Sequence, residues 1–184
     1  MSVYKASILG LALLAGCVDI NIKSVLPKES IYNIDNLDLK NRTCKAPRQI
    51  AIGGINSVNF IDSRSMIEKS SNGQISTIEN ITWIDNPKNM LQNLLQKQAY
   101  NSCIDLTDAN APKTLFITIF FMGFKNGAPQ IELSYKITDP RLKVLEIGQI
   151  IKRKDPKSAD LSPKIKDLQR ISNEAILDIL KLAR

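Results

Sequence analysis

Residues 114–138 read TLFITIFFMGFKNGAPQIELSYKIT, and this stretch decides the fold. Its first part, residues 114–124, predicts the most apolar strand of the chain. Alternate residues of that strand make two apolar faces, with Leu115, Ile117, Ile119 and Phe121 on one and Phe116, Phe120, Met122 and Phe124 on the other. Such a strand is covered on both sides, or it is covered on one side and used for contact on the other.

The residues after this strand predict an antiparallel partner. Residues 125–127, Lys-Asn-Gly, supply a turn. Apolar and polar residues then alternate over 131–138, which is typical of a half-buried antiparallel strand. Residues 139–141 make a second turn into a strand over 142–151. The C-terminal half therefore predicts a three-stranded antiparallel meander.

The upstream half predicts further strands. Residues 49–60 form one, and the glycine pair Gly53-Gly54 within it indicates a bulge or a close backbone approach. Residues 65–69 and 75–83 form two more, joined by an Asn-Gly turn that favours a hairpin. The short apolar patch at residues 31–34 is a candidate edge strand.

Two segments predict helices. Asn86-Pro87 combines a capping side chain with a proline at the first helical position, and the helix is expected to fade near residues 100–101. Ser162-Pro163 repeats this device before an apolar stripe that runs to the C-terminus. The predicted order is β-β-β-α-β-β-β-α. It indicates an α+β fold with a mostly antiparallel sheet and two helices packed on one face.

The N-terminus has the pattern of a secretory signal. A polar start with Lys5 precedes an apolar run over residues 6–14, and Ala15, Gly16 and Cys17 follow. The run is shorter than the roughly 20 apolar residues that a membrane-spanning helix needs. One interpretation of this pattern is an ordinary secretory signal in which Cys17 occurs by chance. The other depends on the position of Cys17.

With Cys17 directly after the cut, the segment resembles a bacterial lipoprotein signal, whose lipobox reads Leu-Ala-Gly-Cys. The resemblance implies that Cys17 is diacylated and becomes the mature N-terminus, which anchors the chain to a phospholipid membrane. We therefore divide the chain into a signal peptide (1–16), a tether (17–30) and one domain (31–184). Because Val18 rather than Asp follows Cys17, we expect the protein in the cell envelope at the outer membrane, facing the periplasm.

Two other cysteines, Cys44 and Cys103, would then lie in an oxidising compartment. An even pair there is expected to form a disulfide, with two free buried thiols as the alternative. Without histidine, the two cysteines lack the ligands for a closed zinc centre, so we expect no metal.

Composition argues against catalysis and against nucleic-acid binding. The chain has no histidine, which removes the commonest general base, and no phosphate loop or catalytic motif stands out. We expect neither an enzyme nor a cofactor.

The formal net charge of +7 fits a solvated surface or attraction to anionic lipids or an acidic partner. The basic string Lys152, Arg153 and Lys154 has the same two interpretations.

Aromatic residues supply the remaining candidates for contact. Trp83, the single tryptophan, is expected in the core or at a sheet edge with its N–H bound to a carbonyl, or alternatively at a partner surface. Phe116, Phe120 and Phe124 are either core residues or the lining of a groove for a lipid or a partner.

Residues 49–95 carry a family likeness. They run from a strand into residues 57–61, Ser-Val-Asn-Phe-Ile, and through a hairpin to Trp83 and a proline-containing helix start. This pattern resembles the ABC-type transport auxiliary lipoprotein family, which includes the lipoprotein of the paraquat-inducible Pqi system and its Mla-like relatives. The likeness extends over about residues 31–184. The family's proline is missing from the first segment, and Ile-Asp-Asn at residues 84–86 replaces its small apolar residues after the tryptophan.

The resemblance implies a non-catalytic lipoprotein that works with an MCE-domain substrate-binding protein and an ABC permease and ATPase. Such systems move phospholipids between the two membranes of a didermal bacterium. An uncovered apolar face could bind that partner or build a homo-oligomer. The alternatives are a stand-alone envelope or surface lipoprotein, such as an adhesin or structural protein, and a lipid-binding chaperone.

Overall fold

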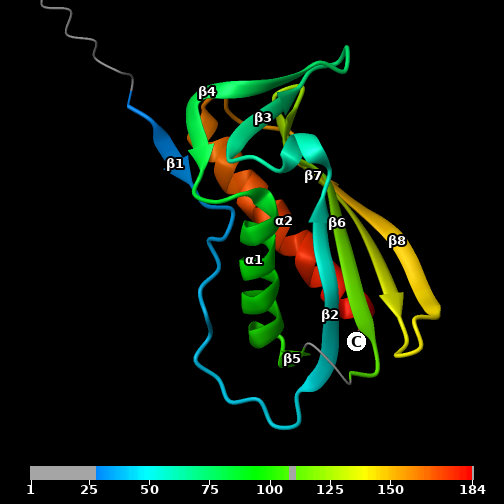
Figure 1. The fold of residues 1–184 in the computed structure, drawn as a ribbon. Coiled ribbons are helices and arrows are strands. Elements are labelled where there is room, and N and C mark those ends of the chain that lie inside the picture. Colours follow the sequence, from blue (N-terminus) through cyan, green and yellow to red (C-terminus); the bar gives the residue numbers. More distant parts are fainter. Residues whose placement is uncertain (1–27, 108–110, 184) are drawn as a thin grey trace, which may run out of the picture.

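The computed structural model describes residues 28–107 and 111–183. The predicted signal peptide, Cys17 and most of the predicted tether lie outside the described residues. The elements in chain order are β1 Ser30–Tyr32, β2 Arg48–Ser57, a 3-10 turn Asn59–Ile61, β3 Ser65–Lys69, β4 Ile75–Trp83, α1 Pro87–Asn101, β5 Ile104–Thr107, β6 Thr114–Lys125, β7 Ala128–Thr138, β8 Val144–Arg153 and α2 Leu161–Ala183 (Figure 1).

One eight-stranded sheet contains all the strands, and β6 is its central member. The antiparallel strands β7 and β8 follow β6 on one side through short turns. On the other side, β6 pairs in parallel with β2 and, at its far end, with β3. β3 and β4 form an antiparallel hairpin, while β1 and β5 add parallel edges. The sheet is mixed, and its longest pairings are antiparallel.

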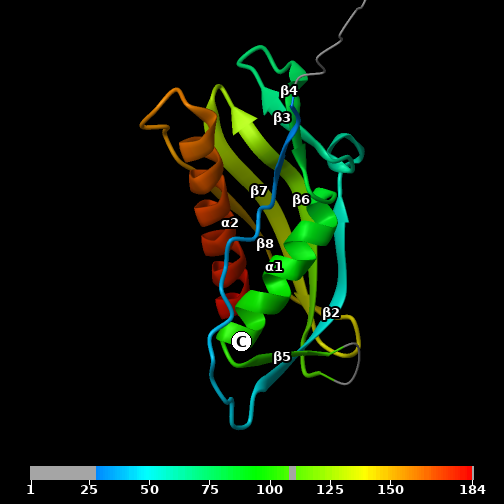
Figure 2. The ribbon, with the colours of Figure 1, turned by 90° about the vertical axis from the view of Figure 1, so that its left-hand side faces the viewer.

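Both helices lie on the same face of this sheet (Figures 1 and 2). α1 begins as predicted, with the Asn86 side chain accepting a hydrogen bond from the N–H of Asn89 at 2.9 Å. The apolar stripes of α1 and α2 join the inner side of the sheet in one core. The predicted α+β class with two helices on one face is confirmed. β5 was not predicted, and it adds a short strand after α1.

A β-bulge in β6 determines which phenylalanines reach the core. The pairing of β6 with β7 shifts between Ile119 and Phe121, so Phe120 is an extra residue in the ladder. An extra residue reverses the side-chain alternation beyond it. Met122 and Phe124 are therefore buried in the core. The prediction that these two share the outer face with Phe116 is wrong for this reason.

Residues 33–42, here called the strap, run between the two helices on the side away from the sheet (Figure 2). Its residue Ile34 is fully buried and belongs to the core. The strap has no regular secondary structure, so its backbone groups need side-chain partners. A disulfide between Cys44 and Cys103, the pairing that the sequence predicts, joins the residues just after the strap to the end of α1.

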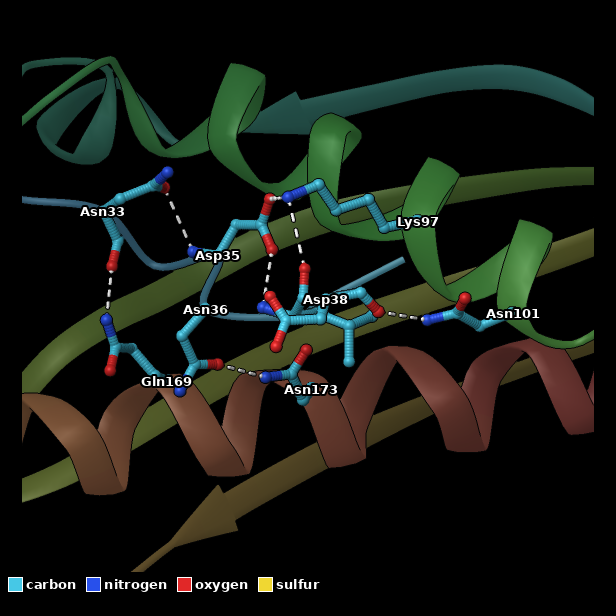
Figure 3. Close-up of polar contacts among 9 residues, drawn as sticks. Asn33, Asp35, Asn36, Asp38, Lys97, Asn101, Gln169 and Asn173 are labelled. Atoms are coloured by element: carbon cyan, nitrogen blue, oxygen red, sulfur yellow. Dashed lines mark hydrogen bonds and ion pairs between the residues drawn. The ribbon is translucent and has the colours of Figure 1, made fainter. Parts of the chain in front are cut away.

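Polar side chains from both helices hold the strap (Figure 3). From α1, Lys97 forms an ion pair with Asp35 at 2.6 Å, and the side chain of Asn101 donates a hydrogen bond to the Asp38 carbonyl at 2.9 Å. From α2, Gln169 donates to the carbonyl of Asn33 at 2.7 Å. The outer surface of the helix layer is thus covered by a polar, well-bonded segment.

Candidate interaction surface

The face of the sheet opposite the helices carries no layer of secondary structure from the described residues (Figures 1 and 2). We call this surface the open face. Its side chains come from alternate positions of the three strands that form the C-terminal meander. They are Phe116, Thr118, Phe120, Glu132, Ser134, Lys136, Leu145, Ile147, Gln149 and Ile151.

Large apolar side chains are exposed on the open face. The exposed fraction is 72% for Ile147, 59% for Ile151, 52% for Leu145 and 42% for Phe120. Single exposed apolar residues are ordinary on a protein surface, but contiguous apolar patches on a monomer mark interaction sites. The open face is therefore the candidate functional site.

β8 has its apolar side turned away from the core. Its even-numbered residues face the helices, where Lys152 forms an ion pair with Asp178 of α2 at 2.7 Å. Glu146 accepts a hydrogen bond from the Tyr135 hydroxyl at 2.8 Å. This bond is the main cause that raises the pKa of Tyr135, followed by burial of the hydroxyl and the charge of Glu146. The inner side of β8 thus carries two charged residues and a glycine beside the half-buried Ile150, while its outer side is rich in exposed leucine and isoleucine.

Gly148 permits the contact between Tyr135 and Glu146. A Cβ atom at Gly148 would stand 2.5 Å from the Tyr135 hydroxyl oxygen, closer than any side chain could tolerate. Glycine therefore lets the tyrosine ring cross over β8 and reach Glu146 on the helix side. Because Tyr135 and its cross-strand partner Gly148 both lie on the helix side, the tyrosine does not cover the outer side of β8.

At the other border of the open face, the ring of Phe116 lies over β2. A Cβ atom at Gly53 would stand 2.3 Å from the ring, so the glycine makes room for it. The Lys136 ammonium lies 4.6 Å from the ring centroid on the neighbouring strand, which is a cation–π distance. Phe116 is consequently half-buried, and Phe120 is the more accessible of the two aromatic rings.

A shallow hollow of about 230 Å³ lies in the middle of the open face. Phe120, Gln149 and Ile151 line it together with Glu132 and Leu133. Its walls offer apolar surface, one carboxamide and one carboxylate. The hollow is suited to receiving a side chain from another molecule, because its volume is below the 300–1,000 Å³ of usual small-molecule sites.

The structure separates the predicted aromatic candidates. Trp83 and Phe124 are buried in the core, while Phe116 and Phe120 lie on the open face. The backbone of Trp83 is fixed by Arg64, whose carbonyl accepts its N–H at 2.7 Å and whose guanidinium donates to its carbonyl at 2.9 Å. Its indole N–H has no acceptor among the described residues, so the expected carbonyl partner is absent there.

Each residue of the predicted basic string forms an ion pair. Lys152 contacts Asp178, and Lys154 contacts Asp167 of α2 at 2.7 Å. Arg153 lies 3.6 Å from Asp155. Two of the three cations thus fasten the end of β8 to α2, and they do not form a cluster of unpaired positive charge.

The described residues contain neither a candidate metal site nor a helix suited to crossing a membrane. No cluster of histidine, cysteine and acidic side chains among them could hold a metal ion. None of their helices has the length and apolar character that crossing a membrane requires.

The sequence analysis did not predict that residues of β8 contribute to the open face. Leu145, Ile147 and Ile151 were assigned to a strand but not to a surface. A signal was present, because the alternate positions Glu146, Gly148 and Lys152 are polar or small. The more apolar side of a strand normally faces the core, so the pattern alone predicts the opposite orientation.

Known structures share this fold. An uncharacterised protein with a crystal structure has a TM-score of 0.66 at 13% identity, and the match covers 85% of this chain and 97% of that one. Protein XCC0632 from Xanthomonas campestris, of the DUF330 family, has a TM-score of 0.68 at 14% identity, covering 82% and 92%. The PelC dodecamer from Paraburkholderia phytofirmans has a TM-score of 0.43 at 10% identity, covering 75% and 90%.

Searches with the sequence itself gave no match. No family model matches the chain, and no curated protein does. The likenesses to the uncharacterised protein and to XCC0632 are at such low identity that they establish the fold alone.

Proposed function

We propose that this chain is a membrane-anchored accessory lipoprotein of an ABC/MCE-type lipid transport system, located in the periplasm at the outer membrane. It acts by binding a partner protein and has no turnover of its own. The lipobox at Cys17 supports the anchor, and the resemblance over residues 31–184 supports the class of transport system.

The open face is the single observation that carries this proposal. Two helices and the strap protect one side of the sheet, while Phe120 and the isoleucines of β8 stay exposed on the other. Burying such side chains on association contributes roughly 25 cal/mol per Å² of apolar area before the costs of binding. The proposed occupant of this face is the MCE-domain substrate-binding protein.

Replacing Phe120 tests this role. Phe120→Ser should weaken association with the proposed MCE-domain partner from the same organism, because the ring is exposed and lines the hollow. The control is Leu39→Ser, an even more exposed apolar residue that lies on the strap. Binding of the intact chains can be measured by biolayer interferometry, and envelope-barrier function by detergent sensitivity. Equal binding by wild type and Phe120→Ser would contradict the proposal.

The anchor has a separate test. Cys17→Ala should move the protein from the membrane fraction to the soluble fraction, because the acyl chains would have no attachment site. Retention on membranes after a high-salt wash would show that the anchor lies elsewhere. Density-gradient separation of the two membranes then tests the outer-membrane location.

A lipid-binding chaperone is the second candidate, and one hollow favours it. A cavity of about 380 Å³ between α1 and β2 is lined by Ile52, Leu95 and Leu106 together with polar residues that include Lys88. Lipid that co-purifies with the intact chain and is lost in Leu95→Trp would support this function. Protein-only association through the open face predicts that no lipid stays bound.

A further inference from the structure

β8 has a free edge. Within the part of the chain that the structure describes, its one strand partner is β7. The N–H of Lys154 donates to the Pro129 carbonyl on the β7 side at 3.1 Å. In an antiparallel ladder, N–H and C=O of one residue point the same way and alternate along the strand. The backbone groups of Ile147, Gln149 and Ile151 therefore point toward the free edge.

The sequence of β8 is complementary to itself. When two copies of the strand are set antiparallel with Gln149 opposite Gln149, Ile147 lies opposite the second copy's Ile151. The two isoleucines are on the open face, where each pair buries apolar surface. On the helix side, Glu146 lies opposite the second copy's Lys152, which places unlike charges together. The two-fold symmetry repeats both pairs.

Neighbouring registers lose this match. With Gly148 at the centre, Glu146 lies opposite Ile150 and Val144 lies opposite Lys152. With Ile150 at the centre, Ile147 lies opposite Arg153. Edge strands of soluble proteins usually carry charges or prolines that prevent pairing. The register centred on Gln149 is the one that sets the two exposed isoleucines opposite each other and Glu146 opposite Lys152, and it also places Leu145 opposite Arg153.

We propose that β8 is a homodimer interface, in which two copies of this chain pair their β8 strands antiparallel with Gln149 on the two-fold axis. The axis is perpendicular to the sheet, so the two sheets become continuous and both open faces lie on the same side. The four isoleucines then gather at the centre of a doubled apolar surface. This proposal concerns the edge of the sheet, and it is independent of the partner assigned to the open face.

Cysteine cross-linking of the intact chain in detergent tests the register. In a hydrogen-bonded antiparallel pair the Cα atoms are about 5.5 Å apart, which is within the disulfide range. Gln149→Cys should therefore form disulfide-linked dimers with copper phenanthroline. Leu145→Cys is the matched control, because its two copies would be about 26 Å apart at 3.3 Å per residue. The native cysteines Cys44 and Cys103 are already bonded to each other.

A proline tests the hydrogen bonds of the edge. Gln149→Pro removes an N–H that points away from β7, so the bonds within the sheet are retained. Loss of two symmetric bonds should raise the dimer dissociation constant by about tenfold or more. Gln149→Val keeps the N–H and serves as the control. Sedimentation equilibrium under detergent density matching gives the constants, and circular dichroism checks folding.

Efficient cross-linking of Gln149→Cys but not Leu145→Cys, together with weaker dimerisation of Gln149→Pro than of Gln149→Val, is the expected result. A monomeric wild-type chain, equal cross-linking at both positions, or equal constants for the proline and valine variants would overturn the proposal. If the proline variant unfolds, the cross-linking comparison alone decides, because both cysteine replacements are on the exposed side of β8. A higher oligomer without a Gln149 cross-link would also overturn it.

Discussion

The two faces of the sheet are built from the same strands, but the inner face is buried and the outer face is exposed. On the inner face, Leu115, Ile117 and Ile119 of β6 are almost fully buried beneath the helices. On the outer face, Phe120 and Ile147 are exposed, although they are as apolar as the buried residues. The inner face accounts for the stability of the domain, since apolar burial is the main favourable contribution to folding. The outer face is therefore available for association.

The outer surface of the helix layer provides a useful contrast with the open face. There the strap covers the helices and satisfies its backbone with side chains such as Lys97 and Asn101. The strap follows the predicted tether after β1, so it lies close in sequence to the proposed anchor. The domain thus has one polar, covered side and one apolar, open side, an asymmetry that suits the proposed function of an anchored protein that binds a partner.

The sharpest test of this comparison uses two phenylalanines of one strand. Phe124→Ala should lower the free energy of unfolding by about 3–5 kcal/mol, because it leaves a cavity in the core. Phe120→Ala should change it by about 0.5 kcal/mol or less, as expected for an exposed site. Chemical denaturation of the intact chain measures both values. Similar losses for the two variants would show that the open face is part of the core.

These two residues also show the limit of prediction from sequence. Apolar periodicity was sufficient to predict β6, β7 and both helices, since the signals are local and strong. The bulge at Phe120 was not predictable, because it depends on the register with β7 rather than on the identity of the residue. It places Phe124 on the core face of the sheet, whereas the simple alternation of the sequence had put it on the same face as Phe116.

The other differences between prediction and structure have the same origin in long-range contacts. β5 is four residues long and exists because it pairs with β2, which is distant in sequence. The partners of Lys152 and Lys154 are on α2, so the sequence alone showed a basic string where the structure has ion pairs. The sequence alone did not predict the strap, because the side chains that hold it come from both helices, which are distant in sequence.

Loss of the disulfide should increase local opening only on the side of the domain that the strap covers. Replacing Cys44 and Cys103 with serine should lower the free energy of unfolding by about 2–4 kcal/mol, since the sequence separation of 59 residues implies a large loss of constraint on the unfolded chain. Hydrogen exchange should increase in the strap and at the end of α1 but stay unchanged in β7 and β8. Faster exchange across the open face would contradict the independence of the two sides.

A smaller effect is expected from the ion pair that holds the strap. Asp35→Ala removes the partner of Lys97 and the acceptor for the backbone N–H of Leu37. The Asp35 side chain is almost buried, so the loss should be about 1–2 kcal/mol, in the range of charge-assisted hydrogen bonds. Asp62→Ala, an exposed carboxylate outside the strap, is the control for charge. Thermal unfolding of the two variants measures the difference, and equal stability would mean that the strap contributes little.

The smallest expected effect is a pH-dependent change in stability that arises from the ion pair between Lys152 of β8 and Asp178 of α2. A hydrogen bond from Lys152, aided by one from Lys181, holds the pKa of Asp178 below its ordinary value of 3.8, against the opposing effect of burial. Because the folded-state pKa is depressed, the unfolded chain binds the proton more tightly. The resulting stability is present above pH 4 and is lost as pH falls through the folded-state pKa.

The Asp178 side chain is 36% exposed, so solvent screening limits the contribution to about 0.5 kcal/mol. Asp178→Asn should therefore be less stable than wild type at neutral pH, and the difference should disappear as the pH falls through the folded-state pKa of Asp178 and shrink in high salt. Gln149→Val carries no titrating group and should differ from wild type by the same amount at every pH. A difference for Asp178→Asn that does not change with pH would show that β8 is fastened to α2 by packing, without a contribution from this charge.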